Sequence, residues 1–241
     1  MHKKTQIIIS TILLIMISVF CTTKIYSYWH DRKVANKYYD TLATNITELT
    51  LDDNIRVNFE ELKRENKDIF AWIKIDGTNI DYPVVKGKDN DYYLTHLSNK
   101  KYSKVGSIFL DYRNNSKLSD YHSIIYGHTL KNDTMFSELE KYKDESFYNE
   151  HPEYYIITEN KTYKVKIFSA YVASTKESAW KLEFGSNEEF LNWAQVVKKK
   201  SLYETNFTPD SNDLIITLST CSYEFKNARF VVSGILEEIN R

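Results

Sequence analysis

Cysteine, proline and glycine are scarce in this chain: its 241 residues include 2 Cys, 3 Pro and 6 Gly. Two cysteines are too few for a disulfide-rich scaffold or a cysteine-based zinc cluster. So little proline and glycine excludes collagen-like and proline-rich recognition segments. The formal net charge of −1 gives no general reason to expect a nucleic-acid partner. Aromatic residues, by contrast, are abundant, and 19 Tyr and 12 Phe favour a β-rich core over a coiled coil.

The longest apolar run lies near the N-terminus, over residues 5–23, and follows Lys3 and Lys4. As a helix this run rises about 28 Å, which matches the hydrocarbon core of a bilayer. We predict an uncleaved transmembrane anchor, because no small-x-small cleavage site follows the run; a cleaved signal peptide is the alternative. Basic residues before the span favour a cytoplasmic tail at residues 1–4 and an extracellular position for the rest of the chain.

Helical patterns continue beyond the span. Residues 24–50 have apolar and aromatic side chains at helical spacing, which predicts a helical stalk. Residues 51–241 are then expected to form one folded domain. This domain begins with a second helical region over residues 52–71, where Asn58 and Glu61 resemble a capping box.

Short strands dominate the rest of the pattern. One clear helix is expected over residues 186–203, with Ser186 and Glu189 as its capping box. Many short strands, one long helix between late strands and no regular βαβ alternation predict a mainly β fold, a barrel or sandwich with accessory helices. The expected strands cover residues 72–75, 80–85, 106–110, 123–126, 154–158, 163–174, 213–221 and 229–236.

Cys221 is the only cysteine outside the predicted span and has no partner for an intramolecular disulfide. It is either a buried small hydrophobe or a reactive thiol. A hairpin of the last two strands would place Cys221 opposite Arg229, with Ser219 on the same face as the thiol. A guanidinium there can favour the thiolate or bind an oxyanion. A structural ion pair is the alternative role for Arg229.

Acyl transfer to or from an amine also needs a general acid, which is most often histidine. Among the six histidines, His128 follows an apolar strand and Gly127, so it is expected at the edge of a sheet. His96, His122 and His151 lie in polar contexts and are expected at the surface. A purely structural histidine is the alternative interpretation of His128.

These residues resemble a known family. The segment Thr217–Cys221, followed eight residues later by Arg229, resembles the active-site signature of sortases, which are membrane-anchored cysteine transpeptidases of Gram-positive bacteria. The segment Tyr126–His128 is similar to the family's histidine strand, and residues 72–78, 80–85 and 106–113 resemble its early strands. The N-terminal helices and the helix at 186–203 resemble those of class B sortases. The similarity spans roughly residues 55–238.

The resemblance implies a closed sortase-type β-barrel and a mechanism. Cys221 would attack a threonine carbonyl in the C-terminal sorting signal of a surface protein, forming a thioacyl enzyme. His128 would move the protons, and Arg229 would hold the substrate and stabilise the oxyanion. Ser219 and Thr220 would contact the substrate. The acceptor would be an amine of a peptidoglycan precursor or wall peptide, and no metal or cofactor is expected.

Two alternatives stay open on the sequence. The first is another extracellular cysteine acyl-transferase or protease, although papain-like enzymes place the cysteine before the histidine, the reverse of the order here. The second is a non-enzymatic, membrane-tethered β-barrel that binds a partner. The second alternative predicts that Cys221 is buried and inert.

Overall fold

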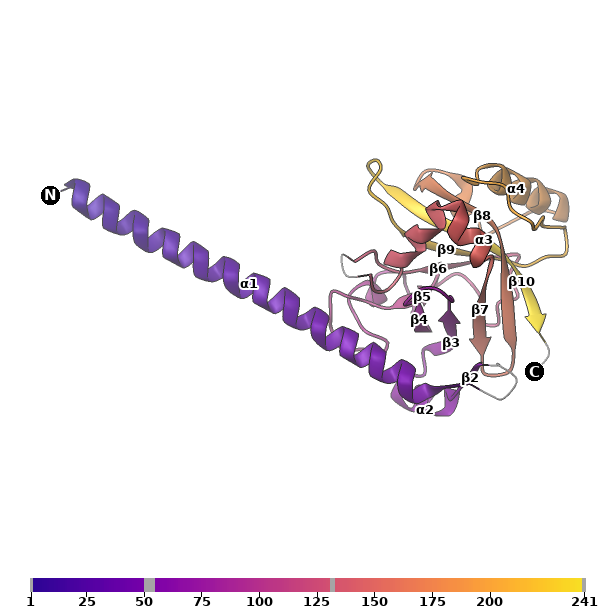
Figure 1. Ribbon diagram of the computed structural model, residues 1–241, viewed down its shortest axis with the longest axis horizontal. Helices are drawn as coiled ribbons and strands as arrows, with labels where there is room; N and C mark the ends of the chain where they lie inside the picture. Colours follow the sequence, from indigo (N-terminus) through magenta and orange to yellow (C-terminus); the bar gives the residue numbers. More distant parts are fainter. Residues whose placement is uncertain (1, 50–54, 131–132, 240–241) are drawn as a thin grey trace.

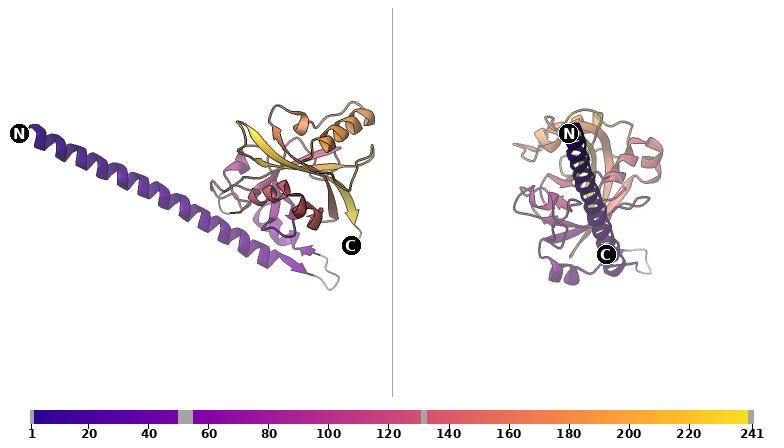
Figure 2. Two further views of the ribbon diagram at one scale, coloured as in Figure 1. Left: turned by 45° about the horizontal axis from the view of Figure 1, so that its top comes forward. Right: turned by 90° about the vertical axis from the view of Figure 1, so that its left-hand side faces the viewer.

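The computed structural model describes residues 2–49, 55–130 and 133–239. A single long helix, α1 (His2–Ile46), extends away from a β-rich body (Figures 1 and 2). The predicted span and the predicted stalk as far as Ile46 are therefore parts of one uninterrupted helix. The prediction of a helical stalk was wrong for Thr47–Leu49, which form a strand. By length and composition, α1 is able to cross a membrane, and none of its most apolar stretch is buried by the other described residues. The boundary predicted between residues 50 and 51 lies outside the described residues.

The C-terminal half of α1 packs against the body of the molecule. Ala35 and Tyr39 are buried in the same apolar cluster as the barrel interior. The Tyr39 hydroxyl donates to the Gly106 carbonyl at 2.9 Å, so a buried polar group also joins helix and barrel. Further along, Ile46 is buried against Leu62 of the next helix. The stalk segment thus contributes to the core rather than standing clear of the domain.

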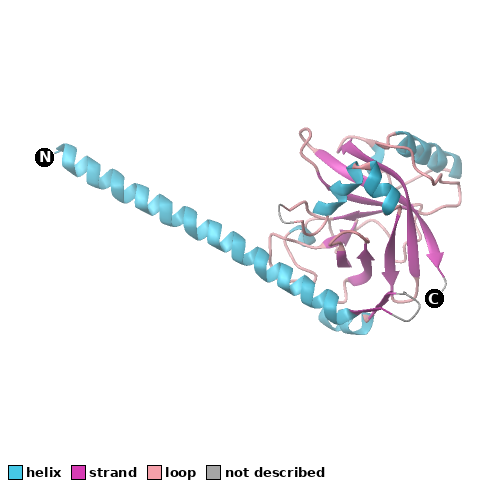
Figure 3. Cartoon of the chain, in the orientation of Figure 1, coloured by secondary structure: helices cyan, strands magenta, loops and turns pink. Residues whose placement is uncertain are grey.

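Eight strands form a closed barrel in the order β10-β8-β7-β3-β4-β5-β6-β9. The prediction of a mainly β fold with a closed barrel and accessory helices is confirmed (Figure 3). A separate two-stranded ribbon, β1 (Thr47–Leu49) with β2 (Ile55–Val57), follows α1. The barrel strands are β3 (Ile69–Lys74), β4 (Asp81–Lys86), β5 (Ile108–Leu110), β6 (His122–Tyr126), β7 (Glu153–Thr158), β8 (Thr162–Ser174), β9 (Ile215–Cys221) and β10 (Ala228–Ile239).

Alternation along β9 separates the barrel interior from its outer wall. Ile216 and Leu218 lie in the interior cluster, whereas Ile215 packs outside against helix α4 (Asn187–Lys199). The predicted helix over 186–203 is confirmed, although it ends at Lys199. Its N-cap is Ser186, whose hydroxyl accepts from the Glu189 amide. Helix α4 therefore covers one end of the outer wall formed by β8, β9 and β10.

The second predicted helical region was too long. Among residues 55–71, only α2 (Phe59–Glu65) is helical, because β2 precedes it and β3 begins at Ile69. Asn58 is the N-cap as predicted, and its side chain accepts from the Glu61 amide at 3.1 Å. Four further helices are short: η1 (Tyr92–Leu94), η2 (Ser137–Lys143) and α3 (Glu145–Glu150) precede β7, and η3 (Ser178–Trp180) precedes α4. Of these, only η2 is predicted by the sequence, from the helical spacing of Phe136, Leu139 and Tyr142.

The prediction that His122 lies at the surface was wrong, because this side chain is fully buried. Its Nδ1 donates to the Lys181 carbonyl at 2.7 Å, which fixes the tautomer and makes Nε2 an acceptor. Nε2 accepts from the Thr217 hydroxyl at 2.8 Å, and that hydroxyl in turn accepts from Ser233 at 2.8 Å. One directed chain of hydrogen bonds thus joins β10, β9, β6 and the segment before α4.

Burial lowers the pKa of His122 to about 4, against the opposing effect of its bond to Lys181. The unfolded chain binds this proton near pH 6.5, so acid favours unfolding between these two values. We expect the free energy of unfolding to fall by about 2.5 kcal/mol from pH 7 to pH 4.5 through this residue alone. Denaturant titrations of the wild type and His122→Gln in detergent measure it. Equal pH dependence of the two proteins would contradict the assignment.

Candidate active site

The last two strands bring a thiol and a guanidinium together. β9 and β10 pair antiparallel, with Cys221 directly opposite Arg229. Directly opposed residues have Cβ atoms about 5 Å apart and point to the same side of the sheet. Both side chains are partly exposed, and Cys221 is a free thiol. The predicted register of the hairpin is therefore present at the end of the barrel where β9 ends and β10 begins, which we call the rim.

His128 reaches the same rim from β6. β6 runs parallel to β9, with Tyr126 paired to Ser219, so two further residues along each strand bring His128 level with Cys221. The Gly127 amide continues the ladder by donating to the Ser219 carbonyl at 3.2 Å. The chain direction of two neighbouring strands thus places His128 at the same end of the sheet as Cys221.

Two threonine hydroxyls fasten these strand ends together. Thr129 donates to the Cys221 carbonyl at 2.6 Å and lies 2.7 Å from the hydroxyl of Thr220. Thr220 donates to the Gly127 carbonyl at 2.8 Å. The residues on either side of His128 are therefore bonded to Cys221 and to its neighbour. Thr129 was missed in the sequence, although it directly follows the candidate histidine.

A backbone carbonyl sets the tautomer of His128. Nε2 lies 2.8 Å from the Leu94 carbonyl, which only accepts, so Nε2 carries the proton. Nδ1 has no hydrogen-bond partner among the described residues and is the nitrogen left for proton transfer. Gly106 lies against the ring with a φ of +68°, and a Cβ there would be 2.9 Å from His128 Cδ2. Both supports come from a loop distant in sequence, which sequence patterns did not reveal.

Arg229 is held by backbone rather than by a carboxylate. Its Nη1 donates to the Ala228 carbonyl at 2.9 Å. Within residues 2–49, 55–130 and 133–239, no ion pair involves its guanidinium. The remaining donors of the fork are therefore available for a negatively charged or carbonyl oxygen at the rim.

Ser219 and Thr220 differ in what their hydroxyls contact. Each side chain is only 2% exposed. The Ser219 hydroxyl has no hydrogen-bond partner among the described residues, whereas that of Thr220 is already bonded to Gly127. A buried hydroxyl without a partner is costly in a folded protein and is satisfied when a ligand supplies one.

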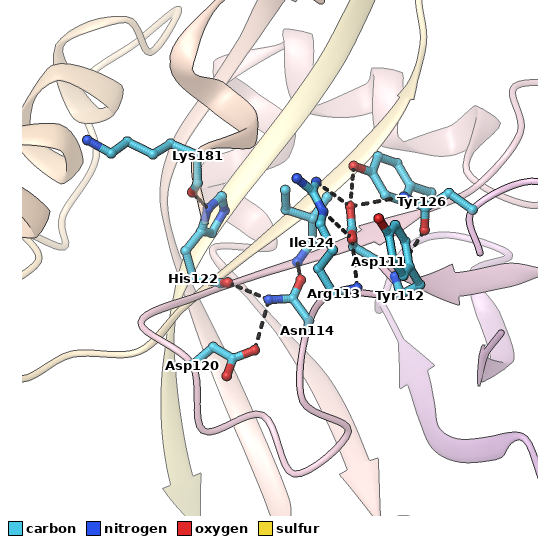
Figure 4. A network of polar contacts seen from close by, with 10 residues as sticks. Asp111, Tyr112, Arg113, Asn114, Asp120, His122, Ile124, Tyr126 and Lys181 are labelled. Atoms are coloured by element: carbon cyan, nitrogen blue, oxygen red, sulfur yellow. Dashed lines mark hydrogen bonds and ion pairs between the residues drawn. The ribbon is translucent and has the colours of Figure 1, made fainter. Parts of the chain in front are cut away.

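A second polar network stabilises β6 on the side that faces β5, opposite β9 (Figure 4). Asp111 is buried and accepts from both Nε and Nη2 of Arg113, at 2.9 and 2.8 Å. The Tyr126 hydroxyl donates to the same carboxylate at 3.1 Å. Burial raises the pKa of Asp111, but the hydrogen bonds from Arg113 outweigh it and hold that pKa below its usual value. The ionised carboxylate thus anchors Tyr126, two residues before His128.

Beside it, Asn114 bonds the backbone of β6 directly. Its amide donates to the His122 carbonyl at 2.8 Å and to the Asp120 carboxylate at 2.9 Å. Its carbonyl oxygen accepts from the Ile124 amide at 3.0 Å (Figure 4). The position of β6, and with it that of His128, is therefore fixed along the whole strand.

A charged cluster joins the β9–β10 loop to η2. Lys143 donates to Glu140 at 3.0 Å and to Glu224 at 2.5 Å, and the Glu224 carboxylate also accepts from Ser222. The hydrogen bonds from Lys143 and then Ser222 lower the pKa of Glu224 to about 2. The loop that leads from Cys221 to Arg229 is thus tied to the body of the domain. In the described part of the chain, no group of three or more His, Cys, Asp or Glu side chains is placed to hold a metal ion.

The arrangement at the rim is suited to nucleophilic acyl transfer. It combines a free thiol, an imidazole with an available nitrogen and a guanidinium without a carboxylate partner. A thiol needs a neighbouring base or cation to become an effective nucleophile. Cys221 is partly exposed, whereas a binding module was expected to have a buried cysteine at this position.

The chain is similar to known proteins both in sequence and in structure. The sortase domain family matches residues 73–237 of the chain. Sortase B of Listeria monocytogenes is 34% identical over 215 residues, which cover 88% of this chain and 87% of that protein. Among solved structures, sortase B of Clostridium perfringens has a TM-score of 0.71 and 42% identity, covering 75% of this chain and 100% of that one. A sortase B–substrate complex from Staphylococcus aureus has a TM-score of 0.77 and 30% identity, covering 88% and 100%.

Proposed function

Given that this chain belongs to the sortase family and is a class B cysteine transpeptidase, we propose that it cleaves C-terminal sorting signals through a thioacyl enzyme. The cleaved surface protein is then transferred to an amine of peptidoglycan. The observation that carries this proposal is the convergence of Cys221, His128 and Arg229 at one rim. The similar Staphylococcus aureus sortase B was solved as a substrate complex, which supports the binding of a substrate by this chain.

In the first half-reaction, the Cys221 proton passes to Nδ1 of His128 as sulfur attacks the scissile carbonyl. A carbon–sulfur bond forms and the carbonyl oxygen becomes an oxyanion, which the Arg229 guanidinium binds. The carbon–nitrogen bond then breaks, and His128 returns the proton to the leaving amine. The product is a thioester between Cys221 and the surface protein.

In the second half-reaction, an incoming amine attacks the thioester carbonyl. His128 accepts a proton from that amine, and the carbon–sulfur bond breaks as an amide bond forms. The proton then returns to the sulfur of Cys221, which restores the resting enzyme. The Leu94 carbonyl keeps Nε2 protonated throughout, so Nδ1 remains the nitrogen that exchanges protons.

We propose the following topology for the chain. Residues 1–4 form a cytoplasmic tail, residues 5–23 span the membrane, and residues 24–241 lie outside the cell. Within that outer part, α1 continues as the helical stalk to Ile46 and leads into the catalytic domain. The uninterrupted apolar half of α1 supports the span, and Lys3 and Lys4 before it support the orientation.

We propose different roles for Ser219 and Thr220. Ser219 is expected to bind the substrate, because its buried hydroxyl lacks a partner. Thr220 is expected to position the strand ends instead of binding substrate, since its hydroxyl already donates to the Gly127 carbonyl.

Ser219→Ala should raise KM for a sorting-signal peptide by about tenfold, as expected for one lost hydrogen bond. Thr220→Val should lower kcat, and Thr220→Ser should restore it. Unchanged steady-state kinetics in Ser219→Ala would show that the Ser219 hydroxyl does not bind the substrate.

Mass spectrometry of the intact chain tests the proposed function. The full chain in detergent is incubated with sorting-signal peptides of varied sequence and quenched in acid. An adduct on Cys221 with the mass of the N-terminal peptide fragment is expected, and it should disappear when an amine such as triglycine is added. Cys221→Ala serves as the negative control. Peptide cleavage without any adduct on wild-type Cys221 would overturn the thioacyl mechanism.

A further inference from the structure

Aromatic residues mark the point where α1 leaves its apolar run. Tyr26, Tyr28 and Trp29 follow that run directly and are 72%, 44% and 64% exposed. Tyr and Trp are enriched where transmembrane helices cross the membrane–water interface. With residues 5–23 in the bilayer, these three side chains lie at the level of the lipid headgroups.

The folded domain meets α1 almost immediately after this aromatic group. Asp31, two residues beyond Trp29, accepts a hydrogen bond from the Lys104 amide at 3.1 Å. Two residues of helix correspond to a rise of about 3 Å. Lys104 is therefore held close to the interface, and the loops on this side of the domain reach α1 well before its C-terminal end (Figure 1).

The segment of residues 98–106, which carries Lys104, runs along α1 toward the span. Its two ends are bonded to α1 farther from the span: the Tyr38 hydroxyl lies 2.8 Å from the Ser98 hydroxyl, and the Tyr39 hydroxyl donates to the Gly106 carbonyl. Asp31 bonds its tip at Lys104. Positions 31 and 39 are about 12 Å apart along a helix. The tip of the segment is consequently the part that lies nearest the bilayer.

The exposed side chains of this tip have the chemistry of a membrane-binding surface. Lys101 and Lys104 are exposed, and among the described residues neither forms an ion pair. Tyr102 is 66% exposed between them. Behind it, the His96 ring lies 5.7 Å from the Tyr102 ring and stacks on Tyr92 at 4.0 Å. Lysines are attracted to anionic lipid headgroups, and tyrosine is enriched at the membrane–water interface.

We propose that residues 99–104, the juxtamembrane loop, dock on the surface of an anionic bilayer. The argument rests on the proposed membrane span, which sets the level of the headgroups. The bilayer is the occupant that fits, because the loop is bonded to α1 just beyond the span and presents unpaired positive charge with an exposed aromatic ring. Docking at a second point restrains rotation of the domain about α1, which one helix alone would leave free.

The docked segment also leads to the proposed active site. Leu94, whose carbonyl bonds His128, and Gly106, which packs on the His128 ring, flank the juxtamembrane loop on its two sides. Contact with the bilayer therefore holds the backbone that positions the imidazole.

A depth measurement on the full chain tests the proposal. In a Cys21→Ala/Cys221→Ala background, a fluorophore is attached to Tyr102→Cys or to Asn160→Cys in nanodiscs of phosphatidylglycerol. Asn160 is exposed in the β7–β8 turn, where the neighbouring Glu159 is paired with Lys63 of α2 beyond the C-terminal end of α1. Lipids with nitroxide headgroups should quench the label at position 102 at least twice as strongly as the label at 160.

Charge variants in the labelled protein supply the matched control. Lys101→Glu/Lys104→Glu should reduce quenching at position 102 to the level seen at 160. Lys176→Glu/Lys199→Glu changes the net charge equally at exposed sites elsewhere and should leave it unchanged. Discs of zwitterionic phosphatidylcholine should also give weaker quenching at 102.

Two outcomes would overturn the proposal in distinguishable ways. Equal quenching at both positions, in chains that co-purify with the discs, would exclude docking and leave the membrane span intact. Failure of the chain to co-purify with the discs would exclude the span, and docking with it. Neither result bears on peptide cleavage, which the adduct measurement tests separately.

Discussion

Cys221→Ala is expected to abolish cleavage of sorting-signal peptides while the fold remains intact. Alanine cannot form the carbon–sulfur bond on which both half-reactions depend. Loss of the nucleophile in cysteine and serine acyl-transfer enzymes removes roughly 10⁴-fold or more of the turnover rate. Peptide cleavage, followed by chromatography of the products, measures the loss.

The structure explains why this variant should still fold. Cys221 is the last residue of β9, is partly exposed, and bonds Thr129 through its backbone carbonyl rather than its side chain. Its thermal unfolding should therefore match that of the wild type to within a few degrees. Turnover comparable to that of the wild type would refute covalent catalysis by this thiol.

Arg229→Lys should lower kcat by about 10²–10³-fold, the usual effect of removing an oxyanion donor. Lysine keeps the positive charge but presents a single flexible ammonium in place of a planar fork. The bond from Nη1 to the Ala228 carbonyl orients the fork in the wild type, and lysine cannot both make that bond and reach the substrate. Steady-state kinetics with a sorting-signal peptide measure the effect.

Arg64→Lys is the matched control for this substitution. Arg64 lies on the surface of α2, pairs with Glu60 and is far from the rim. The same chemical change there should leave both kcat and KM unaltered. Normal kinetics in Arg229→Lys would show that the guanidinium is not required for the chemistry.

The register of the rim could be predicted from the sequence because it depends on local connections. A loop of a few residues between two apolar strands forces antiparallel pairing, so Cys221 and Arg229 had to meet. The position of His128 was expected only at a sheet edge. Its placement beside Cys221 depends on β6 and β9 being parallel neighbours, which are separated by the intervening β7, β8 and α4.

Burial was harder to predict where polar residues are satisfied by distant partners. His122 has polar neighbours in sequence, yet the Lys181 carbonyl and the Thr217 hydroxyl satisfy both ring nitrogens inside the protein. The second helical region was overextended for a related reason. The residues from Ile69 onward have an apolar pattern that suits either a helix or a strand. They form strand β3 because they pair with β4 and β7.

The continuous course of α1 restricts where such an enzyme can work. A flexible linker would let the barrel sample a wide hemisphere above the cell surface. A helix that is bonded to the barrel from Asp31 onward gives the domain a single working height instead. Under the proposed topology, membrane-bound reactants would meet the rim at this height by lateral diffusion within the plane of the bilayer.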